Sequence, residues 1–205
     1  MWHTRHARPG LSVPHWNSQF AIRELRIIPY IYQMRKHTGM RPQDIVILAK
    51  ILSFQNHHWM AKDLASSLFL SPSEVSESLH RSVYAGLINS EKKQVLRLNF
   101  LEFLIHGMRY VFPQQPGSLV RGLPTAHSHP KLQKKFIADN KLVWPDHESN
   151  TIGLSIEPFY SNQILAAKQD ESFYYILCLI DILRLGKPRE VNFAKEELKK
   201  YFHEK

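Results

Sequence analysis

The sequence predicts a mainly α-helical protein, with a short β-hairpin after its third predicted helix and a helical C-terminal extension. Three observations support this fold class. Apolar residues recur at steps of three and four over much of residues 41–112 and 157–202, as they do in amphipathic helices. Capping residues, prolines and glycines bound these stretches. A short basic segment at 88–98 has the composition of a β-hairpin.

Residues 41–54 form the first predicted helix, and residues 60–68 form the second. One stripe of each is apolar. The stripe residues are Ile45, Leu48, Ala49 and Leu52 in the first helix, and Met60, Ala61, Leu64, Ala65 and Leu68 in the second. Phe69 and Leu70 are predicted to form a tight turn after the second helix. These segments predict two helices packed against a third.

The third predicted helix, residues 71–85, has strong signals at both ends. Ser71 is a preferred N-cap, Pro72 takes the first helical position, and Glu74 completes a capping box. Gly86 suits a left-handed C-cap. The inward residues are Val75, Leu79 and Val83. The outward residues are short or polar, as contact with phosphates and base edges requires: Ser73, Ser76, Glu77, His80, Arg81 and Tyr84.

A winged helix-turn-helix domain has this order of elements: two helices, a turn, a third helix and a hairpin. Residues 41–98 resemble that domain in bacterial transcription regulators of the MarR and Lrp type. The resemblance is carried by Leu64-Ala65, Leu70-Ser71-Pro72-Ser73, Val75-Ser76, Leu79 and Ala85-Gly86-Leu87-Ile88. It implies a DNA-binding face made of Ser71, Ser73, Ser76, Glu77, His80 and Arg81 on the third helix, with Lys92, Lys93 and Arg97 on the wing.

Two features depart from that resemblance. Glu77 stands where such regulators often carry a basic or amide side chain, and an acid repels phosphates. It could instead accept a hydrogen bond from the N4 amino group of cytosine. The wing is also short, so we expect it to make slight contact with the minor groove.

The net charge of +9 is unevenly distributed. Residues 1–40 carry a net charge of +5, whereas residues 41–112 and 113–205 carry +2 each. Residues 1–33 are predicted to be either a basic arm that follows DNA phosphates or a disordered leader ahead of the functional start. The rest is predicted as a winged-helix domain (34–112), a proline-rich irregular segment (113–155) and a helical, dimerising region (156–205).

Beyond the hairpin, Asn99 is predicted to cap a helix at 100–112 that is apolar nearly all round. Its predicted core residues are Leu101, Leu104, Ile105, Met108 and Phe112, and Phe103, His106 and Tyr110 are expected to meet a second surface. Further helices are predicted at 131–138, 157–168, 171–185 and 191–202, and the last three are the expected site of dimer contacts.

The sequence argues against several kinds of site and segment. The chain has one cysteine, Cys178, which excludes an internal disulfide and fits a reducing cytoplasm. Its place in an apolar helix indicates a buried, inert thiol. No stretch suits a signal peptide or a membrane span. His127 and His129, with His106 and His147, lack the neighbours of a zinc site. An anion pocket made of Arg109, Arg121 and Thr125 is the alternative use of this region.

No phosphate-binding loop, catalytic triad or paired-acid pattern is present, so we expect no enzyme, cofactor or metal. The leading hypothesis is a cytoplasmic, homodimeric repressor that binds double-stranded DNA. One alternative is a winged helix that binds a protein partner, as an antitoxin does. Another is a sensor that holds a ligand or metal within residues 113–155.

Overall fold

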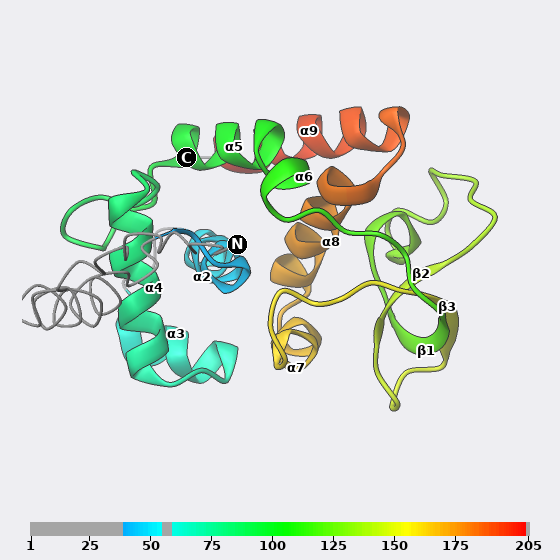
Figure 1. Ribbon diagram of the computed structural model, residues 1–205, viewed down its shortest axis with the longest axis horizontal. Coiled ribbons are helices and arrows are strands. Elements are labelled where there is room, and N and C mark those ends of the chain that lie inside the picture. The colour runs from blue at the N-terminus through cyan, green and yellow to red at the C-terminus, as the bar shows by residue number, and fades with distance from the viewer. Residues whose placement is uncertain (1–38, 55–58, 204–205) are drawn as a thin grey trace, which may run out of the picture. The chain divides into compact units, whose positions relative to one another are not determined.

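The structure is a computed structural model that describes residues 39–54 and 59–203. The predictions for residues 1–33 lie outside the described residues. Over the described part, the chain forms eight α-helices, one 3-10 helix and one small three-stranded sheet (Figure 1). Helices predominate, as expected, but the sheet was not predicted.

The first three described helices lie close to their predicted positions. They are α2 (Pro42–Ser53), α3 (Ala61–Leu68) and α4 (Pro72–Tyr84). Phe69 ends α3 in the left-handed conformation, with φ of 53°. The Ser71 hydroxyl accepts from the Glu74 N–H, and the Glu74 carboxylate accepts from the Ser71 N–H at 2.9 Å. Gly86 follows α4 with φ of 68°, so the predicted signals at both ends of this helix are confirmed.

The predicted hairpin is very short. Ile88 and Val95 form a single β-bridge, and the Leu96 N–H donates to the Leu87 carbonyl at 2.9 Å. The Asn89 side-chain oxygen accepts from the N–H groups of both Lys93 and Gln94. A side chain therefore replaces much of the strand pairing that a longer hairpin would have.

The helix predicted at 100–112 is two helices, α5 (Arg97–His106) and α6 (Met108–Val111). Asn99 does not cap it: Asn99 lies inside α5, and its amide donates to the Gly86 carbonyl. The helix breaks at Gly107, where a Cβ would lie 2.9 Å from the Phe103 carbonyl oxygen. The buried residues of the pair are Phe100, Leu101, Leu104 and Met108, whereas Ile105 and Phe112 are only partly buried.

The segment predicted to be irregular contains the sheet. Its strands are β1 (Leu119–Pro124), β2 (Leu142–Pro145) and β3 (Thr151–Ser155). β1 is antiparallel to both others, and β2 and β3 pair in parallel, so the strands close on one another. The helix predicted at 131–138 is absent; that stretch is a run of turns that follows η1 (Ala126–Ser128).

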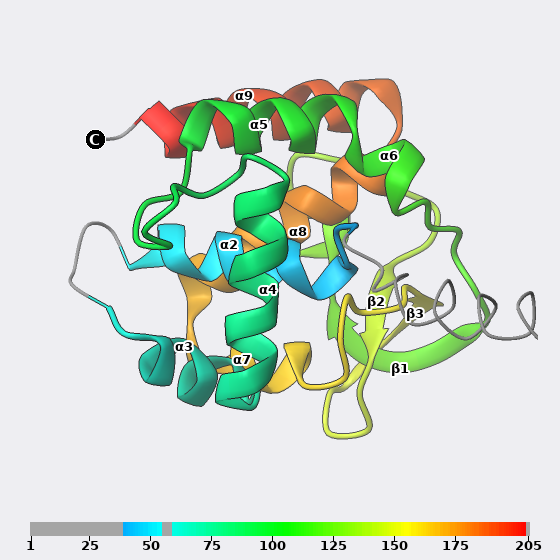
Figure 2. The same cartoon turned by 60° about the vertical axis from the view of Figure 1, so that its left-hand side comes forward.

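The C-terminal helices are α7 (Gln163–Gln169), α8 (Glu171–Leu185) and α9 (Pro188–His203). The predicted helix at 157–168 therefore begins later than expected. α8 contacts α2, α5, α6, α7, α9 and η1, and nearly all of its residues from Phe173 to Arg184 are buried. α9 runs beside α5 (Figure 2), where the rings of Phe202 and Phe100 lie 5.7 Å apart.

This arrangement corrects the expected role of α8. Its apolar surface packs inside a single chain, because the helices around it cover it, so α8 is not an exposed surface for a second copy. Lys50 of α2 donates to Asp170 at the start of α8 at 2.6 Å, and lies over the Phe173 ring. One continuous core extends from α2 to α9.

Candidate nucleic-acid interface

The outward face of α4 is the candidate interface. Its exposed residues Ser73, Ser76, Glu77 and His80 are spaced three and four apart, which places them on one stripe. Val75 and Leu79 on the opposite face are buried against α2 and α3. Figure 2 shows α4 crossing the front of the molecule, with no other described element over it. The local caps and the apolar inner face thus hold a polar helix face toward solvent.

The hairpin reaches the C-terminal part of this face. The Lys92 Nζ lies 2.8 Å from the His80 Nε2, so the structure brings these two predicted residues together. Lys93 is exposed, and its Nζ lies 5.3 Å from the centre of the Trp59 ring. Lys92 thus lies beside α4 and Lys93 beside Trp59, and neither has an acidic side chain at hydrogen-bonding distance among the described contacts.

Arg81 does not belong to the exposed set, which corrects its predicted role in DNA contact. Its Nε and Nη2 donate to the two carboxylate oxygens of Asp44, at 2.8 and 2.6 Å. Asp44 is fully buried, and the Arg81 side chain is only 11% exposed. The hydrogen bond with Asp44 raises the pKa of Arg81. This guanidinium joins α4 to α2, because a buried carboxylate needs a charged partner.

Arg97 and Ser71 also differ from their predicted roles. Arg97 lies at the first position of α5 rather than in the hairpin, and its Nη1 lies 3.4 Å from the Phe202 carbonyl in α9. The Ser71 hydroxyl is exposed but engaged in the cap, since it donates to the Glu74 carboxylate at 2.7 Å. The N–H of Ser71, through its own hydrogen bond, lowers the pKa of Glu74. Both side chains therefore make contacts within the protein.

The surface around α4 carries no net positive charge. Between Ala61 and Leu96, the cationic residues are Lys62, Arg81, Lys92 and Lys93, and the acidic ones are Asp63, Glu74, Glu77 and Glu91. The Arg81 charge is compensated by Asp44. The sequence pattern did not predict this compensation, although Asp44 lies one turn before Leu48 on the buried stripe of α2 and could have indicated it.

The other predicted sites do not assemble. Arg109 donates to the Gly186 carbonyl, Arg121 lies near Asn150, and Thr125 donates to Asp181 in the core, so these three do not form an anion pocket. Among the described residues, no three histidine, cysteine or acidic side chains are grouped as a metal site would need.

Several buried groups of the sheet side are hydrogen-bonded to one another. Asp181 accepts from Thr125, from the Trp144 Nε1 and from Arg184, at 2.7 to 2.8 Å. Burial raises the pKa of Asp181. Burial also raises the pKa of the Cys178 thiol, as an inert cysteine requires. This network joins the sheet to α8.

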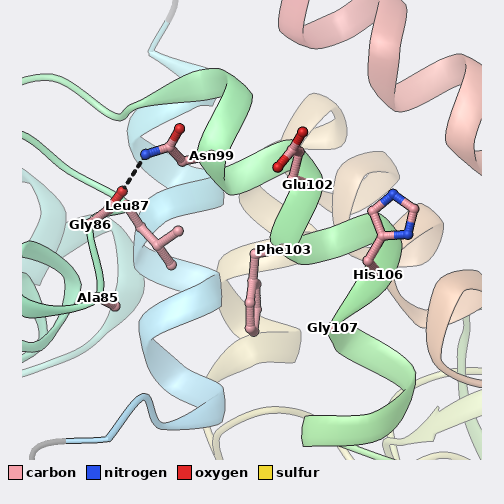
Figure 3. A pocket seen from close by; sticks show the side chains of 8 residues that line it. All are labelled: Ala85, Gly86, Leu87, Asn99, Glu102, Phe103, His106 and Gly107. Carbon is pink, nitrogen blue, oxygen red and sulfur yellow. Dashed lines mark hydrogen bonds between the residues drawn. The ribbon is translucent and has the colours of Figure 1, made fainter.

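A groove of about 540 Å³ lies between the end of α4 and α5 (Figure 3). Glu102 and His106 stand one turn apart on α5, Phe103 points across the groove, and Asn99 closes one end through its bond to Gly86. Ala85, Asn99, Glu102 and His106 are exposed. The groove is therefore open to solvent along much of its lining.

No family model, no curated protein and no solved structure matches this chain. Every helix in the described part of the chain is too short or too polar to span a lipid bilayer.

Proposed function

We propose that this protein is a transcription regulator that binds double-stranded DNA through α4 and the hairpin, as a winged helix-turn-helix does. The observation that carries the proposal is the two-sided character of α4. One face is buried against α2 and α3, and the other presents short polar side chains over a full 13-residue helix. A helix of this kind fits the major groove.

The hairpin supports the same function. Lys92 lies beside His80 of α4, so a phosphate contact by Lys92 would hold the helix at a fixed depth in the groove. Contacts of this kind set register without reading sequence. The near-neutral surface around α4 means that one copy binds weakly. We therefore propose that affinity depends on a homodimer, whose half-sites lie roughly 34 Å apart, or on the net charge of +5 in residues 1–40.

The test is fluorescence anisotropy with DNA from upstream of the protein's own gene, over a range of salt concentrations. The double variant Lys92→Ala/Lys93→Ala is compared with Lys199→Ala/Lys200→Ala, which removes the same charge from α9, where both lysines pair with glutamates. In a plot of the logarithm of the binding constant against the logarithm of the salt concentration, each lost phosphate contact should lower the magnitude of the slope by about 0.9. We expect the hairpin variant to lose up to two contacts and the α9 variant none. Equal slopes in the two variants contradict the proposal.

The balance of charge around α4 favours a second candidate function, binding of a protein partner through the same face. Protein interfaces need polar and apolar complementarity rather than a cationic surface. If the wild-type protein binds no DNA at low salt, this second function replaces the first. Substitution of Ser76 by Arg, on the exposed stripe, should then abolish capture of the partner.

A further inference from the structure

We propose that Glu77 reads a cytosine in the major groove, an inference that rests on the proposed DNA-binding function. Glu77 is central to the exposed stripe of α4, with Ser73 and Ser76 before it and His80 after it. Its side chain is 60% exposed. Because serine side chains are short, Glu77 is the group on this part of α4 that extends furthest from the helix.

The ion pair between Arg81 and Asp44 leaves the Glu77 carboxylate available to a ligand. Arg81 lies one turn further along α4, with its Nη1 at 3.8 Å from the Glu77 Oε2, beyond hydrogen-bonding distance. The same guanidinium makes two short hydrogen bonds to Asp44. Arg81 is therefore held toward α2, and Glu77 keeps acceptor capacity for a ligand.

The chemistry of a carboxylate selects among the four bases. An ionised carboxylate only accepts hydrogen bonds. In the major groove, guanine presents two acceptors, thymine presents an acceptor and a methyl group, and adenine presents an acceptor beside its amino group. Cytosine presents its N4 amino donor. Glu77 is thus repelled by guanine and thymine and matched by cytosine.

His80 and Lys92 give Glu77 the support that such a contact needs. Their side chains meet at 2.8 Å one turn beyond Glu77, which places a cationic group toward the hairpin side of the stripe. A phosphate bound there would offset the repulsion between the Glu77 carboxylate and the DNA backbone. Glu77 then selects the base, and Lys92 contributes to affinity.

The experiment is selection of binding sites from a random double-stranded library by the full chain. It compares the wild type with Glu77→Gln and with Glu102→Gln, which removes the same charge from an exposed position on α5. Both substitutions keep side-chain volume at exposed sites, so both variants should fold, as circular dichroism can verify.

We expect the wild type to select sites with a required cytosine, preferred by about tenfold over other bases. Glu77→Gln should lose that preference and favour adenine at the same position, because an amide both donates and accepts. Glu102→Gln should keep the wild-type sites. If Glu77→Gln selects the same sites as the wild type, the inference is wrong and DNA binding stands. If the wild type selects no sites at low salt, the proposed function itself fails, and the inference with it.

Discussion

The ion pair between Arg81 and Asp44 allows a sharp test, because it separates a structural role from contact with DNA. Replacing Arg81 by Ala removes two donors and leaves Asp44, which is fully buried, with the Arg41 N–H at 2.8 Å as its remaining partner. Breaking a buried pair in this way costs about 3–5 kcal/mol. Since Arg81 retains 11% exposure and the Arg41 bond remains, we expect a loss near 3 kcal/mol.

The matched variants are Asp44→Asn and the double variant Asp44→Asn/Arg81→Ala. Asparagine leaves the Arg81 guanidinium close enough to the surface to meet water, so its cost should be about 1–2 kcal/mol. In the double variant no buried charge is left unpaired. Its loss should therefore be smaller than the sum of the two single losses by about 2 kcal/mol. Urea denaturation followed by far-UV circular dichroism measures all three free energies of unfolding.

Two results would refute this reasoning. Single losses that add within about 0.5 kcal/mol in the double variant would show that the two side chains are not coupled. A stable Arg81→Ala protein that no longer binds DNA would return Arg81 to the DNA-contacting set. Under the proposed DNA-binding function, the folded double variant should bind DNA as tightly as the wild type does.

Three further outcomes follow from single residues. Gly86→Ala should lower the free energy of unfolding by about 1 kcal/mol in urea denaturation, because a φ of 68° strains the backbone of a residue with a side chain, although the added Cβ would meet no atom within 4 Å. Gly86→Asn should lower it less, and equal losses in the two variants would refute the role of backbone strain. Burial, aided by Lys131, lowers the pKa of His129 from 6.5 to about 4. The unfolded chain therefore takes up a proton that the native protein does not, so stability is full above pH 6.5 and falls toward pH 4 by at most about 1.4 kcal/mol per pH unit. His129→Leu should lose part of that pH dependence, which urea midpoints on either side of the window can show. Asp181→Asn should destabilise the protein by about 3 kcal/mol, because buried Arg184 loses its carboxylate partner and keeps only neutral acceptors, the Phe112 carbonyl and the Gln114 side chain; an unchanged midpoint, or unchanged fluorescence of Trp144, which donates to Asp181, would contradict this.

What could be predicted from the sequence is set by how far apart the interacting residues lie. The ends of α4 depend on Ser71, Glu74 and Gly86, which act on backbone groups a few positions away, so the sequence alone indicates them. The role of Arg81 depends on a carboxylate 37 positions earlier. The helical period shows only which residues lie on the same face of the helix as Arg81, and some of those residues are exposed.

The sheet and α8 show two other limits. The strands are four to six residues long and contain Gly122, Gly153 and two prolines, so they carry little of the alternation that identifies a strand. Their pairing depends on residues up to 35 positions apart. α8 is apolar nearly all round, which indicated a buried helix. The sequence does not say whether such a helix is covered by its own chain or by a second copy, and the structure covers it within one chain.

The position of α8 also affects how the protein is made. The Lys50–Asp170 pair joins α2 to a helix that is synthesised 120 residues later. At about 5–20 residues per second, the ribosome reaches α8 on the order of ten seconds after it has made α2. During that time α3 and α4 can pack on α2, but the contacts between α2 and α8 cannot form, so we expect nascent chains that end before residue 171 to bind chaperones and to be cleaved readily by protease. Chains stalled beyond residue 203 should resist cleavage, and equal resistance at both lengths would show that residues 39–112 fold without α8.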